Sequence, residues 1–233
     1  MKSKITELLS KFDKNFYNIL LWFLVVLNIA PILAPIFAWM GLTLPAQAIY
    51  FVYSFFCHQF DWRSLHIHDF QYAWCVRDTF IWLNILVAAV ITKKYKIKGL
   101  KWYWLIPFLV PIALDGGIQT IATILGIFNS EPTYISTNLT RMITGSIFGI
   151  GFGFWIMPGF RDNTYSNDNR ARFPFKRIVF LSMLFILNIV IYILLIQLWS
   201  ISSIKYMPSN FLDYSVKTPA NTNDWFTRRG HAV

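Results

Sequence analysis

The sequence predicts an all-α fold, a polytopic bundle of transmembrane helices. Of its 233 residues, 56% are hydrophobic and only 14% are charged, whereas about 25% of the residues in soluble proteins are charged. Residues 15–60 and residues 178–204 contain no Asp, Glu, Lys or Arg. A soluble domain could not cover so much apolar surface, and each stretch exceeds the roughly 20 residues that cross a bilayer as a helix. We therefore expect a transmembrane helical domain over 17–204, flanked by segments 1–16 and 205–233.

The apolar pattern divides this domain into successive helices. The stretch 15–60 is too long for one crossing, and the segment from Gly41 to Pro45 breaks it into a first span and a shorter apolar piece at 46–60. Pro31 and Pro35 should kink the first span, which neighbouring helices tolerate in a membrane. Full spans are expected at about 17–40, 74–92, 102–127, 141–160 and 178–204.

The basic residues indicate the orientation of the chain, and they account for most of the formal net charge of +10. They gather in three segments: Lys2, Lys4, Lys11 and Lys14; Lys93, Lys94, Lys96, Lys98 and Lys101; and Arg161, Arg170, Arg172, Lys176 and Arg177. Basic loops stay on the cytoplasmic side, where they also meet anionic lipid headgroups. We expect residues 1–16 to form an amphipathic cytoplasmic helix and the polar tail 205–233 to lie outside. The bilayer is then the first partner, and a nucleic-acid partner is not expected.

One conflict bears on the number of spans. If residues 46–60 crossed the membrane completely, the five-lysine loop that follows the next span would lie on the outer side. The piece is short and ends in Cys57-His58-Gln59, so we expect a re-entrant or interfacial half-helix, with residues 57–78 folded back at the outer face. This interpretation gives five full spans plus one partial span, and six full spans are the alternative.

Four groups of polar residues lie among or beside the apolar spans. Such residues are costly in a membrane and are functional candidates by default. The groups are Cys57-His58-Gln59 with Arg63-Ser64; Cys75-Val76-Arg77-Asp78; Asp115-Gly116-Gly117-Ile118-Gln119; and Ser136-Thr137-Asn138-Leu139-Thr140-Arg141, which runs into Met142-Ile143-Thr144-Gly145.

The order of these motifs, CHQ, RS, CxRD, DGxxQ and STNxxRxxTG, resembles a family of prokaryotic integral-membrane proteins classed as a domain of unknown function. The resemblance covers about residues 50–155. It implies a protein of a prokaryotic cytoplasmic membrane and no established activity. In the family the second motif usually reads CxRC followed by Thr-Gly, whereas this chain has Asp78 at the place of the second cysteine and continues with Thr79-Phe80.

This departure suggests a metal site. The family form would supply a Cys-His pair and a Cys-x-x-Cys pair, and in this chain the four candidates become Cys57, His58, Cys75 and Asp78. Two thiolates, an imidazole and a carboxylate suit tetrahedral zinc, and the oxygen ligand makes iron or manganese less implausible. A disulfide between Cys57 and Cys75, or two inert thiols, are the alternatives. The nearby pair His66 and His68 is more typical of exposed loop histidines.

Asp115 falls near the middle of its span. An unpaired carboxylate there would take up a proton or seek a cation, and Arg77 and Arg141 are the available cations. Gly116 and Gly117 weaken the helix beside the acid, which favours a broken helix that lines a cavity. A ligand or proton site and a structural Asp-Arg pair that joins two spans both remain open.

The segment from Ser136 to Arg141 has the composition of a helix start. Ser136, Thr137 and Asn138 can cap the helix, and a helix N-terminus beside an arginine can bind an anion. Further along, glycines recur at every fourth position, at 145, 149 and 153. Because no lysine accompanies them, the spacing predicts a close helix-packing stripe rather than a phosphate loop.

The first of three functional hypotheses is a membrane-embedded enzyme or binding protein. Its metal would activate water or polarise a phosphoryl oxygen, Arg63, Arg77 and Arg141 would hold an anionic or lipid-linked substrate, and Asp115 would act as general base. The remaining polar side chains of the motifs would contact the ligand: Gln59, Gln119, Asn138 and Thr144.

The other two hypotheses use the same residues differently. In a proton-coupled permease, Asp115 and Arg141 would form a midplane site, although the sequence contains no inverted repeat. In a non-catalytic subunit of a larger membrane complex, the glycine and aromatic surfaces would pack against other subunits. The absence of G-x-S-x-G, P-loop, H-E-x-x-H and C-x-x-C-H motifs is compatible with this third hypothesis.

Overall fold

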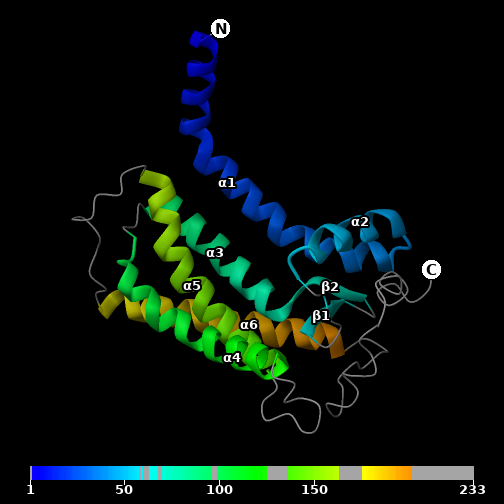
Figure 1. Ribbon diagram of the computed structural model, residues 1–233. Coiled ribbons are helices and arrows are strands. Elements are labelled where there is room, and N and C mark those ends of the chain that lie inside the picture. The colour runs from blue at the N-terminus through cyan, green and yellow to red at the C-terminus, as the bar shows by residue number, and fades with distance from the viewer. Residues whose placement is uncertain are drawn as a thin grey trace.

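A computed structural model describes residues 2–57, 59, 63–67, 70–95, 99–124, 136–162 and 175–200, and this part of the chain is mostly helical (Figure 1). Its elements are α1 (Lys2–Trp39), α2 (Thr43–Ser54), β1 (Ser64–Ile67), β2 (Phe70–Cys75), α3 (Val76–Tyr95), the 3₁₀ helix η2 (Trp102–Leu105), α4 (Ile106–Ile124), α5 (Asn138–Asp162) and α6 (Phe175–Ser200). The expected outer tail, 205–233, lies outside the described residues.

Three stretches of helix are long and apolar enough to cross a membrane: Asn15–Trp39, Asn138–Arg161 and Val179–Gln197. A shorter apolar helix covers Trp102–Ile118. Each matches a span expected from the sequence, whereas helix α3, at the remaining expected span (74–92), is not among the helices that meet this length and apolarity. Helix α2 has only 12 residues, which at ~1.5 Å per residue makes it much shorter than a ~30 Å hydrocarbon core.

Helix α1 continues through both of its prolines, and the first one helps to hold the neighbouring elements. Proline has no backbone N–H, so Pro31 leaves the carbonyl of Leu27 without its intrahelical donor. Two side chains replace that donor: the Tyr53 hydroxyl of α2 at 3.1 Å and the Trp74 indole N–H of β2 at 3.3 Å. The proline therefore creates the acceptor that fixes α2 and β2 against α1.

A two-stranded antiparallel sheet interrupts the helical architecture, which the all-α prediction did not include. Strands β1 and β2 pair His66 with Gln71 and Ser64 with Cys75, with an irregularity between Ser64 and His66. Most of their residues are buried, so the strands lack the alternation of polar and apolar residues by which a half-exposed strand is recognised. Strand β2 passes without a break into α3, as Figure 1 shows.

Helices α3 and α5 pack closely and run parallel. A Cβ atom on Gly145 would lie 2.6 Å from the Arg77 carbonyl oxygen, and one on Gly149 would lie 2.6 Å from the Ile81 carbonyl oxygen. A Cβ on Gly153 would lie 2.7 Å from the Ala88 side chain. The contact positions rise together along both helices, which requires parallel directions. The predicted glycine packing stripe is therefore confirmed.

The parallel arrangement sorts the charged residues between the two ends of the bundle. Both α3 and α5 begin at the end that carries the cysteines, and both have basic residues in their last turn. Lys93 and Lys94 occupy the last turn of α3, and Arg161 in the last turn of α5 donates a hydrogen bond to the Thr92 carbonyl at 2.9 Å. The polar motifs and the basic residues therefore lie at opposite ends.

Candidate functional site

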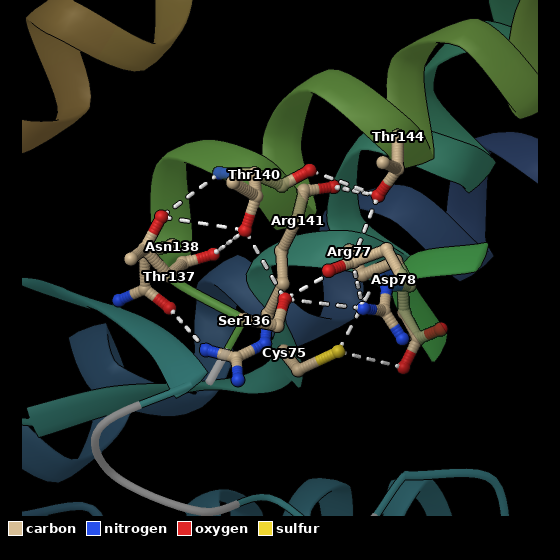
Figure 2. Close-up of polar contacts among 10 residues, drawn as sticks. Cys75, Arg77, Asp78, Ser136, Thr137, Asn138, Thr140, Arg141 and Thr144 are labelled. Carbon is tan, nitrogen blue, oxygen red and sulfur yellow. Dashed lines mark hydrogen bonds and ion pairs between the residues drawn. The ribbon is translucent and has the colours of Figure 1, made fainter. Parts of the chain in front are cut away.

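The junction of β2 and α3 supplies residues to two separate clusters. Cys75 is the last residue of β2 and Val76 is the first residue of α3, so Arg77 and Asp78 lie in the first turn of that helix. A carboxylate is favoured there by the positive end of the helix dipole. The helix sends Arg77 toward α4 and α5, while Asp78 turns back to Cys75 (Figure 2).

The first cluster, which we call the thiol cluster, contains Cys57, Cys75 and Asp78. One ligand atom from each residue lies within 4.8 Å of the others. The Cys75 thiol donates to Asp78 Oδ2 at 3.1 Å, and the Cys75 backbone N–H donates to Cys57 Sγ at 3.3 Å. Cys57 is buried between α1, α2 and β2, and both cysteines are free thiols. The structure thus brings together three of the four residues predicted as metal ligands.

The fourth, His58, lies outside the described residues. Two sulfurs and one carboxylate oxygen match the donor preference of zinc, and they disfavour magnesium and calcium, which prefer oxygen ligands throughout. The hydrogen bond with Cys57, burial and the nearby Asp78 carboxylate raise the pKa of the Cys75 thiol well above its usual range. A metal that binds Cys75 would therefore have to displace the proton of this thiol.

The second cluster, which we call the ion cluster, is centred on Asp115 of α4. Its Oδ2 accepts hydrogen bonds from Arg77 Nη2, from the Ser136 hydroxyl at 3.0 Å and from the Thr144 hydroxyl at 3.2 Å. Arg77 Nη2 also donates to Ser136 Oγ at 3.3 Å. Figure 2 shows the Arg77 guanidinium between α3 and the start of α5. Of the two arginines considered as partners for Asp115, the ion pair in the described structure is with Arg77.

The expected break in the helix beside Asp115 is wrong. Helix α4 is continuous from Ile106 to Ile124, through Gly116 and Gly117. Gly116 instead provides room, because a Cβ atom there would lie 3.1 Å from Arg77 Nη1. The glycine is thus explained by the close approach of the guanidinium rather than by an unwound backbone.

The start of α5 is capped as the sequence predicts. The Thr137 hydroxyl accepts the Thr140 backbone N–H at 3.1 Å, which satisfies one of the free donors of the first turn. Asn138 Oδ1 accepts a hydrogen bond from Arg141 Nη1 at 3.0 Å, and Arg141 is only 2% exposed. The local hydrogen bonds therefore hold Arg141 against the beginning of its own helix.

The remaining predicted site residues lie in different places. Gln59 is buried beside α2 and β2, and Arg63 directly precedes β1. Gln119 is part of α4, but its side chain lies outside the described atoms. The expectation that His66 is an exposed loop residue is wrong, since it is a strand residue that is 4% exposed, whereas His68 lies outside the described residues.

Sequence reasoning missed two residues that connect these elements. Tyr50 donates a hydrogen bond to the Gln71 backbone carbonyl at 2.6 Å, and the Gln71 side chain reaches the segment that follows Cys57. Neither residue belongs to a motif, and their proximity depends on a hairpin that the apolar pattern does not reveal. No sequence signal marked them.

Comparison with known proteins assigns the chain to a family. A family model described as "Predicted membrane protein (DUF2085)" matches residues 57–155, which include both clusters. An uncharacterised protein of the archaeon Methanocaldococcus jannaschii is 34% identical over 163 residues, covering 65% of this chain and 97% of the relative. No solved structure matches the chain. The chain therefore belongs to the DUF2085 family of predicted membrane proteins.

Proposed function

We propose that this membrane protein binds one divalent transition metal, preferentially zinc. The ligands are Cys57, Cys75 and Asp78, with His58 as the fourth. The observation that carries the proposal is the convergence of the two sulfurs and the carboxylate within 4.8 Å. His58 enters on sequence grounds, as the neighbour of Cys57. Four such ligands would make a closed site, whereas three would leave a position for water or substrate.

The comparison between the two acids supports this proposal. Asp115 already has a cationic partner in Arg77. Asp78 has no ion pair within the described part of the chain, and its carboxylate accepts a hydrogen bond from the Cys75 thiol. A carboxylate beside two thiols that lose their protons would concentrate negative charge, and a divalent cation compensates this charge directly.

Metal analysis tests the proposal. The protein should be purified in detergent without a polyhistidine tag, and its metals should be counted by mass spectrometry. We expect about one zinc per chain, with loss of the metal in Cys75→Ser and in Asp78→Asn. His66→Gln is the matched control, because this buried histidine lies on the adjacent strand but is not part of the thiol cluster. Metal-free protein with a Cys57–Cys75 disulfide would refute the proposal.

For the topology, we propose five full spans with α2 as a partial one, in the cytoplasmic membrane, with the N-terminus inside and the C-terminus outside. Helix α2 has 12 residues, and α3 and α5 run in the same direction with basic residues at their ends. Two parallel helices must start on the same side of the membrane. With the basic ends in the cytoplasm, the thiol cluster lies at the outer face.

Labelling in intact cells distinguishes five spans from six. In a background with both native cysteines replaced by serine, an impermeant thiol reagent should modify Asp69→Cys but not Lys94→Cys. The reverse pattern would support six full spans. Cells made permeable before labelling provide the control, because both positions should then react.

The end of the bundle where α3 and α5 finish in basic turns, which we call the basic end, has side chains that suit contact with anionic lipid. Lys101 lies 5.7 Å from the ring centre of Tyr103, and Trp102, Tyr103 and Trp104 are all exposed. Aromatic and basic side chains combined in this way are typical of a helix end at the headgroup level. We propose that this end contacts anionic headgroups on the cytoplasmic side.

The anionic-substrate hypothesis retains Arg63 and Arg141, while Arg77 is better explained as the structural partner of Asp115. The same ion pair weakens the permease hypothesis, because Asp115 accepts hydrogen bonds from three side chains. Proton coupling would require this set of bonds to open during transport. The hypothesis of a subunit in a larger complex has no specific support among the described contacts.

A further inference from the structure

A chain of buried hydrogen bonds lies beside the thiol cluster and connects the segments that carry its cysteines. The Tyr50 hydroxyl of α2 donates to the Gln71 carbonyl of β2 at 2.6 Å. Gln59 Nε2 donates to the Tyr50 carbonyl at 3.0 Å, and Gln71 Nε2 donates to the Gln59 carbonyl at 3.0 Å. The three bonds form a closed circuit between α2, the segment after Cys57, and β2.

The side chains of this circuit are almost completely inaccessible. Tyr50 is 3% exposed, Gln59 is 4% exposed and Gln71 is 2% exposed. Buried polar groups lose their hydrogen bonds to water, so the Tyr50 hydroxyl and the two amide nitrogens must keep their partners within the protein. Among the described residues, Gln59 Oε1 and Gln71 Oε1 are buried without a hydrogen-bond partner. A shift of the Cys57 segment relative to β2 would break several of these bonds together. The circuit therefore favours one relative position of the two segments.

The backbone of Gln59 adds a second constraint. Its φ angle is 51°, in the left-handed region that residues other than glycine rarely adopt. Such a conformation persists where surrounding contacts determine it, and here the Gln59 carbonyl and side chain are both hydrogen-bonded. Gln59 lies two residues after Cys57, so its fixed conformation and hydrogen bonds constrain the chain close to that cysteine.

The circuit also acts on the strand that carries Cys75. Gln71 precedes Cys75 by four residues on the same strand, β2. The Cys75 backbone N–H lies 3.3 Å from Cys57 Sγ. Holding the Gln71 side chain against the Gln59 backbone thus fixes the distance between the two cysteine-bearing segments.

We propose that Tyr50, Gln59 and Gln71 are positioning residues that place Cys57 opposite Cys75 for metal binding. None of the three is itself a ligand in this proposal. The inference rests on the proposed metal site and adds the device that preorganises it. Groups bonded directly to metal ligands typically contribute about 10–100-fold to metal affinity, and we expect an effect of this order from residues that hold the two cysteine-bearing segments together.

The test uses the full-length protein in detergent with Co²⁺ as a spectroscopic substitute for zinc. Thiolate-to-cobalt absorption reports sulfur ligation, and the ligand-field bands report the coordination geometry. Gln71→Met removes the side-chain donor with little change in volume, and Tyr50→Phe removes only a hydroxyl. We expect each variant to bind Co²⁺ about 10–100-fold more weakly, with altered ligand-field bands.

Asn188→Leu is the matched control, since it removes a buried amide that bonds to Asn84 on another part of the bundle. Its metal affinity and spectrum should equal those of the wild type, even if it lowers the melting temperature. Gln59→Gly replaces Gln71→Met in the experiment if the latter does not fold. Glycine tolerates the positive φ angle but removes the side-chain hydrogen bond.

The outcomes separate the two proposals. A wild-type protein that binds neither Co²⁺ nor Zn²⁺ would refute the metal site itself. A wild-type protein that binds metal, with Gln71→Met and Tyr50→Phe matching it in affinity and spectrum, would refute only the positioning role. An equal loss of affinity in Asn188→Leu would also refute it, because the effect would then follow general destabilisation.

Discussion

The thiol cluster and the ion cluster both draw on the motif Cys75-Val76-Arg77-Asp78. They differ in how completely their charged side chains are paired within the protein. In the ion cluster, Asp115 accepts bonds from Arg77, Ser136 and Thr144, which come from α3, the segment before α5, and α5 itself. In the thiol cluster, the Cys75 thiol donates to Asp78 Oδ2 at 3.1 Å and accepts the Asp78 backbone N–H at 3.5 Å, and no cation pairs with Asp78 within the described part of the chain. The ion cluster has the internal charge balance of an architectural element.

This difference divides the polar motifs by role. Residues whose charge is compensated by other helices should affect stability when changed, and they should leave metal content unaltered. Residues of the thiol cluster should affect metal content, with a smaller effect on the stability of the metal-free protein. Measuring both the free energy of unfolding and the metal content of each variant therefore tests this division.

The largest effect is expected at the ion pair. Arg77→Met would leave the buried Asp115 carboxylate without its cation, which typically costs about 3–5 kcal/mol in the free energy of unfolding. The double variant Arg77→Met/Asp115→Leu should recover much of this loss, because it removes the second charge as well. Denaturation in detergent, followed by tryptophan fluorescence, measures both variants. A single variant as stable as the wild type would contradict the architectural role of Arg77.

The helices of the ion cluster were predictable from sequence, whereas the choice of partner was not. Apolar runs predicted helices at about 74–92, 102–127 and 141–160, where the structure has α3, α4 and α5. Asp115 had two candidate arginines, and only the parallel register of α3 and α5 brings Arg77 to it. Such a register depends on side-chain packing between distant segments, which a single sequence does not display.

The residues of the thiol cluster were predicted from their types, but the hairpin and the hydrogen bonds that hold them together were not. Cysteine, histidine and aspartate at these positions suggested a metal site, with a disulfide or inert thiols as the alternatives. The hairpin that brings Cys75 toward Cys57 has short, two-sided buried strands, and their periodicity gives no strand signal. Tyr50 and Gln71 consequently looked like ordinary residues of an apolar segment.

A smaller effect is expected at the glycine contact between α3 and α5. Gly149→Ala would place a Cβ atom 2.6 Å from the Ile81 carbonyl oxygen and 2.9 Å from its Cα. Both are backbone atoms, so the helices must separate, and we expect a loss of about 1–3 kcal/mol. Metal content should not change, because neither Gly149 nor Ile81 belongs to the thiol cluster. Thermal unfolding and metal analysis of the same preparation test both expectations.

Gly117→Ala is the matched control for this prediction. Nothing lies within 4 Å of a Cβ atom at Gly117, and alanine is favoured over glycine inside a helix by about 0.8–1.0 kcal/mol. The control should therefore be neutral or stabilising. If both alanine variants lost equal stability, the effect of Gly149→Ala would not report close packing.

The smallest effect is expected where α6 meets α3. Asn84 and Asn188 donate to each other's side-chain oxygens at 2.9 Å, and each also donates to the carbonyl four residues before it. That second bond remains when the partner is lost, so neither amide is left without an acceptor. A double-mutant cycle with Asn84→Leu and Asn188→Leu should therefore give a coupling of about 0.6 kcal/mol, up to about 1.7 kcal/mol, as for other hydrogen bonds between membrane helices. A coupling as large as that of the Arg77–Asp115 pair would mean that neutral amides and compensated charges contribute equally to this bundle, and the distinction between its clusters would then rest on metal binding alone.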